Sequence, residues 1–173
     1  MEYYKQRQFL ATVSKKNEVM GSIEKWKAHE EGILHRGFTV CLFFKDKIVL
    51  QHRKLLVFDG YMDLTCSSHP ILINNELQSV EVAAKETLKR EWNFKSGQKL
   101  TVKGPIYYKA KDVISGFTEH ELCYLVLGRV TRLPHPNPEF SYGSSLLTKK
   151  QITEKPITEI LAPWVRKLLP LLD

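Results

Sequence analysis

Residues 38–51, FTVCLFFKDKIVLQ, contain the pattern that decides the fold of this chain. Two apolar runs rich in β-branched residues, 38–44 and 47–51, are separated by Lys45 and Asp46. Two such runs joined by a two-residue turn are typical of a β-hairpin. The sequence therefore predicts a hairpin here, and the segments on either side indicate what surrounds it.

Further strands are predicted on both sides of the hairpin, at residues 8–14, 61–70, 100–110 and 120–130. The turn-like residues 15–21 suggest that the first of these strands opens a hairpin of its own. Pro70 is expected to end the strand at 61–70, because proline cannot donate a ladder hydrogen bond. Residues 21–35 are more polar and predict a loop or a short helix.

One clear helix is predicted in the middle of the chain, over 79–92. Ser79 is positioned to cap it, and apolar residues recur at every fourth position: Val80, Ala84, Leu88 and Trp92. We interpret this stripe as core packing. The tail, 157–173, predicts an amphipathic helix interrupted at Pro163 and Pro170. Strands thus outnumber helices, which predicts a fold of the α/β class, a mixed sheet flanked by helices.

The composition is that of an ordinary globular protein. The chain has 173 residues, 43% hydrophobic and 26% charged, which predicts a single domain over 1–173. No apolar stretch approaches the about 20 residues that a membrane helix needs, and the N-terminus lacks a signal-peptide pattern. The 3 cysteines show no CxxC spacing and predict reduced thiols. We therefore expect a cytoplasmic protein with no membrane span.

The charge is strongly positive, at +7. Such a surplus suits anionic partners such as phosphates, nucleic acid or an acidic membrane surface, but a merely basic surface explains it equally well. The sequence has no arginine-rich run, RNA-binding aromatic string or zinc-finger spacing. We therefore expect no nucleic-acid partner.

A candidate metal site begins at Glu119-His120-Glu121. Strand alternation places Glu119 and Glu121 on one face and His120 on the other. Two carboxylates so close require a cation, a shared proton or open water. Three histidines could complete a divalent site of Mn, Mg or Zn type with them: His29, His35 and His69. The alternative is a set of exposed acids and ordinary surface histidines.

Other candidates for chemistry have simpler explanations. Tyr108 and Trp164 are more often core or rim aromatics than catalytic ones. No G-x-S-x-G elbow surrounds Ser67. Cys66 and His69 are three residues apart, and in a strand this places them on opposite faces. Spacing alone therefore assigns no nucleophile.

Five ordered segments nevertheless resemble a known family: HEEGILHRGF (29–38), TCSSHP (65–70), YYKA (107–110), EHELCYLV (119–126) and APW (162–164). Together they are similar to type 1 isopentenyl diphosphate isomerase, of the Nudix superfamily. The resemblance runs from about Gly21 to Trp164. It implies a Nudix-type α/β/α sandwich with a mixed β-sheet, and a metal-dependent enzyme that interconverts isopentenyl and dimethylallyl diphosphate.

The resemblance also implies a set of site residues. One metal would be held by His29, His35, His69, Glu119 and Glu121. A second ion, Mg²⁺ bridging to the substrate diphosphate, would be held by Glu91. Proton transfer is implied for Glu121, assisted by Tyr108, and Trp164 would face the developing carbocation. Lys25 and Arg53 would contact the diphosphate. The expected partner is thus a small diphosphate, bound by a monomer or dimer.

Several residues depart from the family pattern. The position of the family's catalytic cysteine holds Ser67, and because a hydroxyl is a far weaker acid than a thiol, this predicts a slow isomerase. Helix arginines of the family are replaced by Glu86 and Thr87, and Arg90 replaces an acid of the Nudix box. The family's phosphate-binding lysine has only Lys54 as a match.

Two alternative functions stay open on these departures. One is a Nudix pyrophosphohydrolase acting on a nucleoside diphosphate derivative. The other is a non-catalytic relative that binds a prenyl diphosphate without turning it over, because one fold hosts many functions.

Overall fold

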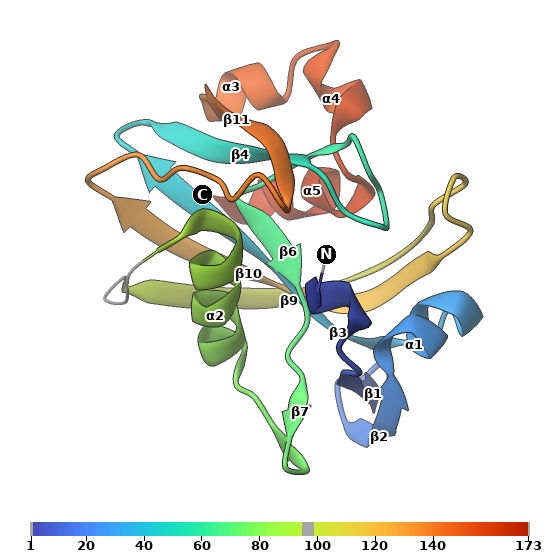
Figure 1. The fold of residues 1–173 in the computed structure, drawn as a ribbon. Helices are drawn as coiled ribbons and strands as arrows, with labels where there is room; N and C mark the ends of the chain where they lie inside the picture. Colours follow the sequence, from blue (N-terminus) through green and yellow to red (C-terminus); the bar gives the residue numbers. More distant parts are fainter. Residues whose placement is uncertain (1, 95–98, 173) are drawn as a thin grey trace.

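The computed structural model describes residues 2–94 and 99–172 (Figure 1). Its strands are β1 (Phe9–Val13), β2 (Val19–Glu24), β3 (His35–Phe44), β4 (Lys47–Arg53), β5 (Met62–Asp63), β6 (Cys66–Ser68), β7 (Leu72–Ile73), β8 (Glu76–Leu77), β9 (Leu100–Lys111), β10 (Thr118–Val130) and β11 (Ser141–Leu147). Its helices are α1 (Lys25–Glu31), α2 (Val80–Trp92), α3 (Lys149–Ile152), α4 (Ile157–Ile160) and α5 (Pro163–Leu168), with 3₁₀ turns η1 (Glu2–Lys5) and η2 (Leu169–Leu172).

Strand β3 lies at the centre of a mixed sheet. It pairs antiparallel with β1, β4 and β6, and parallel with β10. β10 in turn pairs antiparallel with β9. The predicted hairpin at 38–51 is confirmed as β3–β4, with Phe43 opposite Ile48 across the turn. The predicted opening hairpin is confirmed as β1–β2. The parallel β3–β10 pair brings the start of both strands to the same place, and the candidate site lies there.

One face of the sheet is covered by α2 (green in Figure 1). The side chain of Ser79 accepts a hydrogen bond from the amide of Val82, which confirms the predicted helix start. Three of the four predicted stripe residues are buried: Ala84, Leu88 and Trp92. They pack with alternate residues of β3, which are Phe38, Val40 and Leu42. This packing fixes α2, and with it Glu91, against the sheet.

The opposite face is covered by α5 and the segments around it. Trp164, Val165 and Leu168 form a second apolar cluster with Cys41 of β3 and Leu125 of β10. Two apolar layers on opposite sides of one mixed sheet make an α/β/α sandwich, which confirms the predicted fold class. No helix in the described ranges is long and apolar enough to cross a membrane. All three cysteines are buried free thiols.

Two predicted elements differ in detail. The strand expected over 61–70 is two short strands, because β5 pairs with β4 whereas β6 pairs with β3. The chain switches partner between them. The tail is not one interrupted helix. Pro163 begins α5, where a proline costs no hydrogen bond because the first amides of a helix have no partner within it.

Candidate active site

Five predicted metal ligands converge at the start of β3 and β10. α1 supplies His29, the first residue of β3 is His35, His69 follows β6, and β10 supplies Glu119 and Glu121. The parallel register places Glu121 opposite His35. As predicted from strand alternation, His120 lies on the other side, where its ring bonds to the carbonyl of Gly32.

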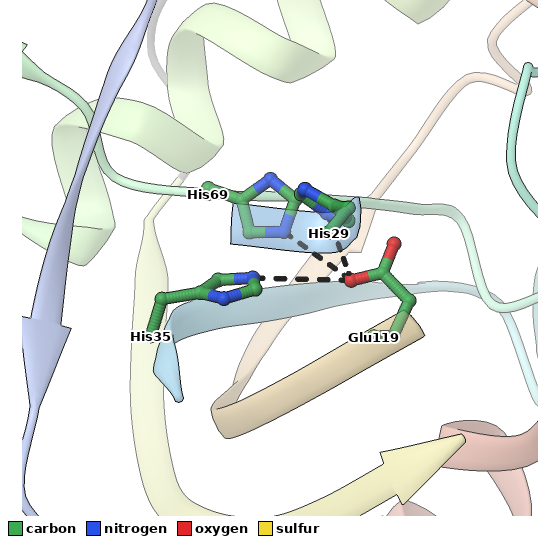
Figure 2. A group of neighbouring side chains, drawn as sticks. All are labelled: His29, His35, His69 and Glu119. Carbon is green, nitrogen blue, oxygen red and sulfur yellow. Dashed lines mark ion pairs between the residues drawn. The ribbon is translucent and has the colours of Figure 1, made fainter. Parts of the chain in front are cut away.

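The Nε2 atoms of the three histidines lie close to oxygens of the two carboxylates. Glu119 Oε2 lies 3.1 Å from Nε2 of His29, 3.6 Å from Nε2 of His69 and 3.9 Å from Nε2 of His35. Glu121 Oε1 lies 2.7 Å from Nε2 of His69 and 3.7 Å from Nε2 of His35. Figure 2 shows the three rings directed at one oxygen of Glu119. This convergence is the arrangement that a metal site requires.

Backbone carbonyls fix the orientation of two of the rings. Nδ1 of His29 lies 2.6 Å from the carbonyl of Lys25, and Nδ1 of His35 lies 2.7 Å from that of Ile33. Because a carbonyl only accepts, Nδ1 must carry the hydrogen in both rings. The lone pair of a neutral ring is then on Nε2, directed at the carboxylates, as in metal-bound histidines.

The pKa values reflect this crowding of charge. Burial alone would raise the pKa of Glu119, but the imidazoles of His29 and His69 hold that pKa well below its usual value. Burial would also raise the pKa of Glu121, but the imidazoles of His35 and His69 lower that pKa below its usual value. Burial would lower the pKa of His69, but both carboxylates raise it to about 9. Both carboxylates are therefore charged at neutral pH.

The residues present fit a divalent cation. Four ligand atoms, from His29, His35, His69 and Glu119, lie within 4.8 Å of one another and are buried. Within the described part of the chain, Nε2 of His35 and Oε2 of Glu119 have no hydrogen-bond partner. A buried polar atom without a partner is costly, and a cation at this point would satisfy both.

Gly37 makes room for one of the carboxylates. A Cβ atom at this position would overlap the carboxylate of Glu121 on the neighbouring strand. The absence of a side chain on β3 thus lets Glu121 lie flat against the sheet, next to His35. Sequence reasoning did not identify Gly37, although it lies within the 29–38 motif.

The predicted acid–base residues lie beside the cluster. The hydroxyl of Tyr108 donates to Oε2 of Glu121 at 2.7 Å. Burial, with the charge of Glu121 next, raises the pKa of Tyr108 well above its usual value, so this hydroxyl keeps its proton. Oγ of Ser67 accepts from Nε1 of Trp164 at 3.0 Å and lies 2.8 Å from Oγ1 of Thr39. Cys66, the preceding residue in β6, faces the α2 side instead.

These groups surround one small cavity of about 50 Å³. The four predicted catalytic residues line it: Ser67, Tyr108, Glu121 and Trp164. Tyr3 and Tyr4 of η1 also line it, and Tyr4 packs on Trp26 with ring centroids 5.8 Å apart. The carbonyl of Tyr4 accepts from Nε1 of Trp26 at 3.3 Å. The N-terminal turn therefore forms part of the cavity wall, which sequence reasoning missed because nothing local marks where it docks.

Trp164 is predicted to face the carbocation, but other side chains already lie close to its ring. The guanidinium carbon of Arg53 lies 4.9 Å from its centroid, and the ring of Tyr108 lies 5.8 Å away. Its N–H is shared between Asp63 at 2.9 Å and Ser67. Trp164 lines the cavity, but Arg53 and Tyr108 already lie close to its ring.

The predicted diphosphate contacts divide into three cases. Lys25 lines the cavity, and its Nζ lies 5.0 Å from the ring centroid of Tyr3. Arg53 also lines it, but its guanidinium donates at 2.6 Å to Asp63 and to two backbone carbonyls, of Val57 and Phe58. Lys54 lies outside the cavity lining and donates to the carbonyl of Pro138 at 3.1 Å. Nζ of Lys25 also donates to Oε1 of Gln8 at 3.4 Å. The structure thus places Lys25 and Arg53 at the cavity, and it lends the Lys54 prediction no support.

Glu91 lines the same cavity, but its carboxylate is already paired. Oε1 accepts from Nη2 of Arg90 at 2.8 Å, and Oε2 accepts from Nε2 of Gln51 at 3.2 Å. Mg²⁺ takes oxygen ligands, whereas the side chains that contact Glu91 present N–H donors, and one of them is a guanidinium whose positive charge would repel the ion. The residues around Glu91 therefore do not fit the second ion that the resemblance implies.

Known proteins resemble this chain in both sequence and structure. No protein-family model matches the chain. The human isopentenyl-diphosphate delta-isomerase 2 is 31% identical over 185 aligned residues, which cover 93% of this chain and 80% of the human protein. The isopentenyl-diphosphate delta-isomerase of Nocardia farcinica is 30% identical over 167 residues, covering 93% of this chain and 92% of the bacterial one.

Solved structures show which fold the chain shares. A Deinococcus radiodurans protein superposes with a TM-score of 0.69 at 14% identity, covering 94% of this chain and 98% of its own. The MutT Nudix hydrolase of Burkholderia pseudomallei superposes with a TM-score of 0.56 at 17% identity, covering 81% of this chain and 98% of its own. These likenesses confirm the Nudix fold. The sequence relatives confirm the resemblance drawn from the five motifs, and the chain belongs to the isopentenyl-diphosphate delta-isomerase family.

Proposed function

We propose that this protein interconverts isopentenyl diphosphate and dimethylallyl diphosphate by a proton shift across an allylic system. One observation carries the proposal: the side chains of Ser67, Tyr108, Glu121 and Trp164 line one cavity against the His/Glu cluster. Such an arrangement offers an acid and a base around one slot, which the chemistry needs because the intermediate is a tertiary carbocation.

Glu121 and Tyr108 form one side of the proton transfer. Protonation of the alkene uses its π electron pair to form a C–H bond and leaves a tertiary cation, and loss of a proton from the adjacent carbon restores a double bond. The hydrogen bond from Tyr108 orients the carboxylate of Glu121 and can pass its proton on. A divalent cation held by the cluster would fix this carboxylate and lower its basicity.

Ser67 forms the other side. Its hydroxyl, held by Trp164 and Thr39, has a pKa far above that of a thiol, so it relays a proton slowly at neutral pH. The slow rate expected from the sequence therefore stays part of the proposal.

We assign the cofactor and setting on chemical grounds. Three imidazoles with two carboxylates suit Mn²⁺ or Zn²⁺ better than Mg²⁺, which prefers oxygen ligands, while Mg²⁺ accompanies the substrate diphosphate. Lys25 supplies positive charge at the cavity. Three buried free thiols suit a reducing, cytoplasmic compartment. We propose a small diphosphate as the substrate, with no nucleic-acid partner, and a monomer or dimer.

Deuterium exchange tests the function directly. The protein, loaded with Mn²⁺, is incubated with dimethylallyl diphosphate and Mg²⁺ in heavy water, and the recovered diphosphates are analysed by mass spectrometry. Deuterium in both isomers is expected. No deuterium at any protein concentration would overturn the proposal, and release of a nucleoside monophosphate from a nucleotide panel would favour the hydrolase instead.

The serine provides a second test. Ser67→Cys is expected to raise the exchange rate by about tenfold or more, because a thiol restores an efficient acid–base group. Ser67→Ala is the matched control and is expected to lower it. A Cys variant no faster than the parent, with metal content unchanged, would mean that Ser67 does not lie at the proton-transfer position.

A further inference from the structure

Arg90 forms an ion pair with Glu91. Its side chain folds back along α2, so that Nη2 donates at 2.8 Å to Glu91 and at 3.2 Å to Oγ1 of Thr87. The guanidinium carbon lies 4.0 Å from the ring centroid of Tyr3 and 5.7 Å from that of Phe140. Two aromatic rings and two hydrogen bonds therefore hold one guanidinium in a defined place.

This place is the wall between two cavities. Arg90 lines the catalytic cavity and also an adjoining polar cavity of about 440 Å³. His69, Ser68 and Tyr3 line both cavities as well. The two spaces therefore adjoin beside the metal cluster, with Arg90 between them.

Arg90 keeps donor capacity for such an anion. In the described part of the chain its Nε is buried and has no hydrogen-bond partner. A guanidinium offers five N–H donors, and Glu91 and Thr87 both draw on Nη2 alone. Planar, bidentate recognition of phosphate is what arginine does better than lysine.

The charge around Tyr3 is positive. Burial would raise the pKa of its hydroxyl, but the charges of Lys25 and Arg90, with a hydrogen bond from Gln8, lower it instead. Nζ of Lys25 lies 5.0 Å from the centroid of the Tyr3 ring, and the guanidinium carbon of Arg90 lies 4.0 Å from it. Two cations within 5.0 Å of one ring favour an anion at this point.

We propose that Arg90 binds the substrate diphosphate, and that Glu91 is the counter-ion that orients this arginine rather than a ligand of a divalent cation. The inference rests on the proposed isomerase function. Helix α2 has Glu86 and Thr87 in place of the two family arginines. Arg90, about one turn further along the helix, supplies the positive charge instead, and its side chain reaches back over the small Thr87.

Inorganic pyrophosphate is the probe that tests this without turnover. Its affinity for the Mn²⁺-loaded protein is measured by calorimetry for the parent and for Arg90→Gln, Arg90→Lys and Lys89→Gln. Lys89 is the matched control, because it is an exposed cation on the same helix. We expect Arg90→Gln to weaken binding at least tenfold, Arg90→Lys to retain part of it, and Lys89→Gln to change it less than twofold.

The number of Mn²⁺ ions per chain, counted by electron paramagnetic resonance with pyrophosphate present, tests the role of Glu91. Glu91→Gln is expected to leave that number unchanged. Loss of one protein-bound ion in Glu91→Gln, or an affinity for pyrophosphate that Arg90→Gln does not alter, would overturn the proposal. These readouts are independent of catalysis: absent deuterium exchange with Arg90-dependent binding intact would refute the isomerase and leave the Arg90 site standing.

Discussion

Gly37 shows how a single missing side chain shapes the site. Because a Cβ atom there would overlap the carboxylate of Glu121, Gly37→Ala is expected to push Glu121 out of line with His35 and His69. A displacement of about 1 Å costs on the order of 100-fold in rate, so kcat should fall by about that factor. Steady-state kinetics and metal content measure the effect.

Gly21 is the control for this substitution. It also lies in a strand, β2, but a Cβ atom there meets Thr12 only at 3.5 Å, an ordinary contact. Gly21→Ala should leave both kcat and metal content unchanged. If Gly37→Ala kept full activity, the observed position of Glu121 would not be the catalytic one.

Tyr108 acts at the same scale. Tyr108→Phe removes the 2.7 Å hydrogen bond to Glu121 but keeps the ring. We expect kcat to fall roughly 10- to 100-fold with a small change in KM, because the lost contact orients a catalytic group and binds no diphosphate. Tyr107→Phe, on the opposite side of β9 against His120, is the matched control. Equal effects of the two variants would argue against a catalytic role for Tyr108.

At the scale of elements, the turn η1 forms one wall of the catalytic cavity. It is held by Tyr3 and Tyr4, which pack on each other and on Phe140. Replacing both tyrosines with alanine is expected to admit water, lowering kcat by about tenfold. Water that reaches a tertiary cation adds to it, so a tertiary-alcohol diphosphate should also be found among the products by mass spectrometry.

Tyr142 is the control for the loss of a large aromatic side chain. It lies on β11 and is 62% exposed. Tyr142→Ala should alter neither rate nor products. A Tyr3/Tyr4 double variant that matched the parent in both would show that η1 does not seal the cavity.

For the whole molecule, the metal cluster ties separate elements together. His29 on α1, His35 on β3, His69 after β6 and Glu119 on β10 come from four parts of the chain. A cation at about 100 times its dissociation constant would add roughly 2.7 kcal/mol of stability, since it binds the folded state alone. Chelation is therefore expected to lower Tm by about 5–10 °C, measured by calorimetry.

Reloading with Mn²⁺ should restore Tm, whereas a variant with Glu119→Gln should gain much less from the ion. An unchanged Tm after complete chelation would exclude a structural contribution from the metal. We also infer that the two apolar clusters, which share the central sheet, unfold in a single transition as one domain.

Local patterns predicted the parts of the fold that backbone geometry sets. The hairpin at 38–51, the helix over 79–92 and the shared face of Glu119 and Glu121 follow from periods of 2 and 3.6 residues, turns and caps. The metal-site residues came from resemblance to a family, since the spacing of three histidines left a surface alternative open. Strand pairing places His35 opposite Glu121, and burial of His29, His35 and Glu119 contradicts the surface alternative.

Only the tertiary structure decided how the charges of the site are used. From the resemblance, Arg53 was expected to bind the substrate and Glu91 a metal ion. In the structure Arg53 pairs with buried Asp63, and Glu91 pairs with Arg90. Local sequence patterns also did not predict that Tyr3 and Tyr4 line the catalytic cavity. The physical reason is that side-chain alternation depends on neighbours along the chain, whereas the partner of a buried charge depends on distances that packing of remote segments fixes.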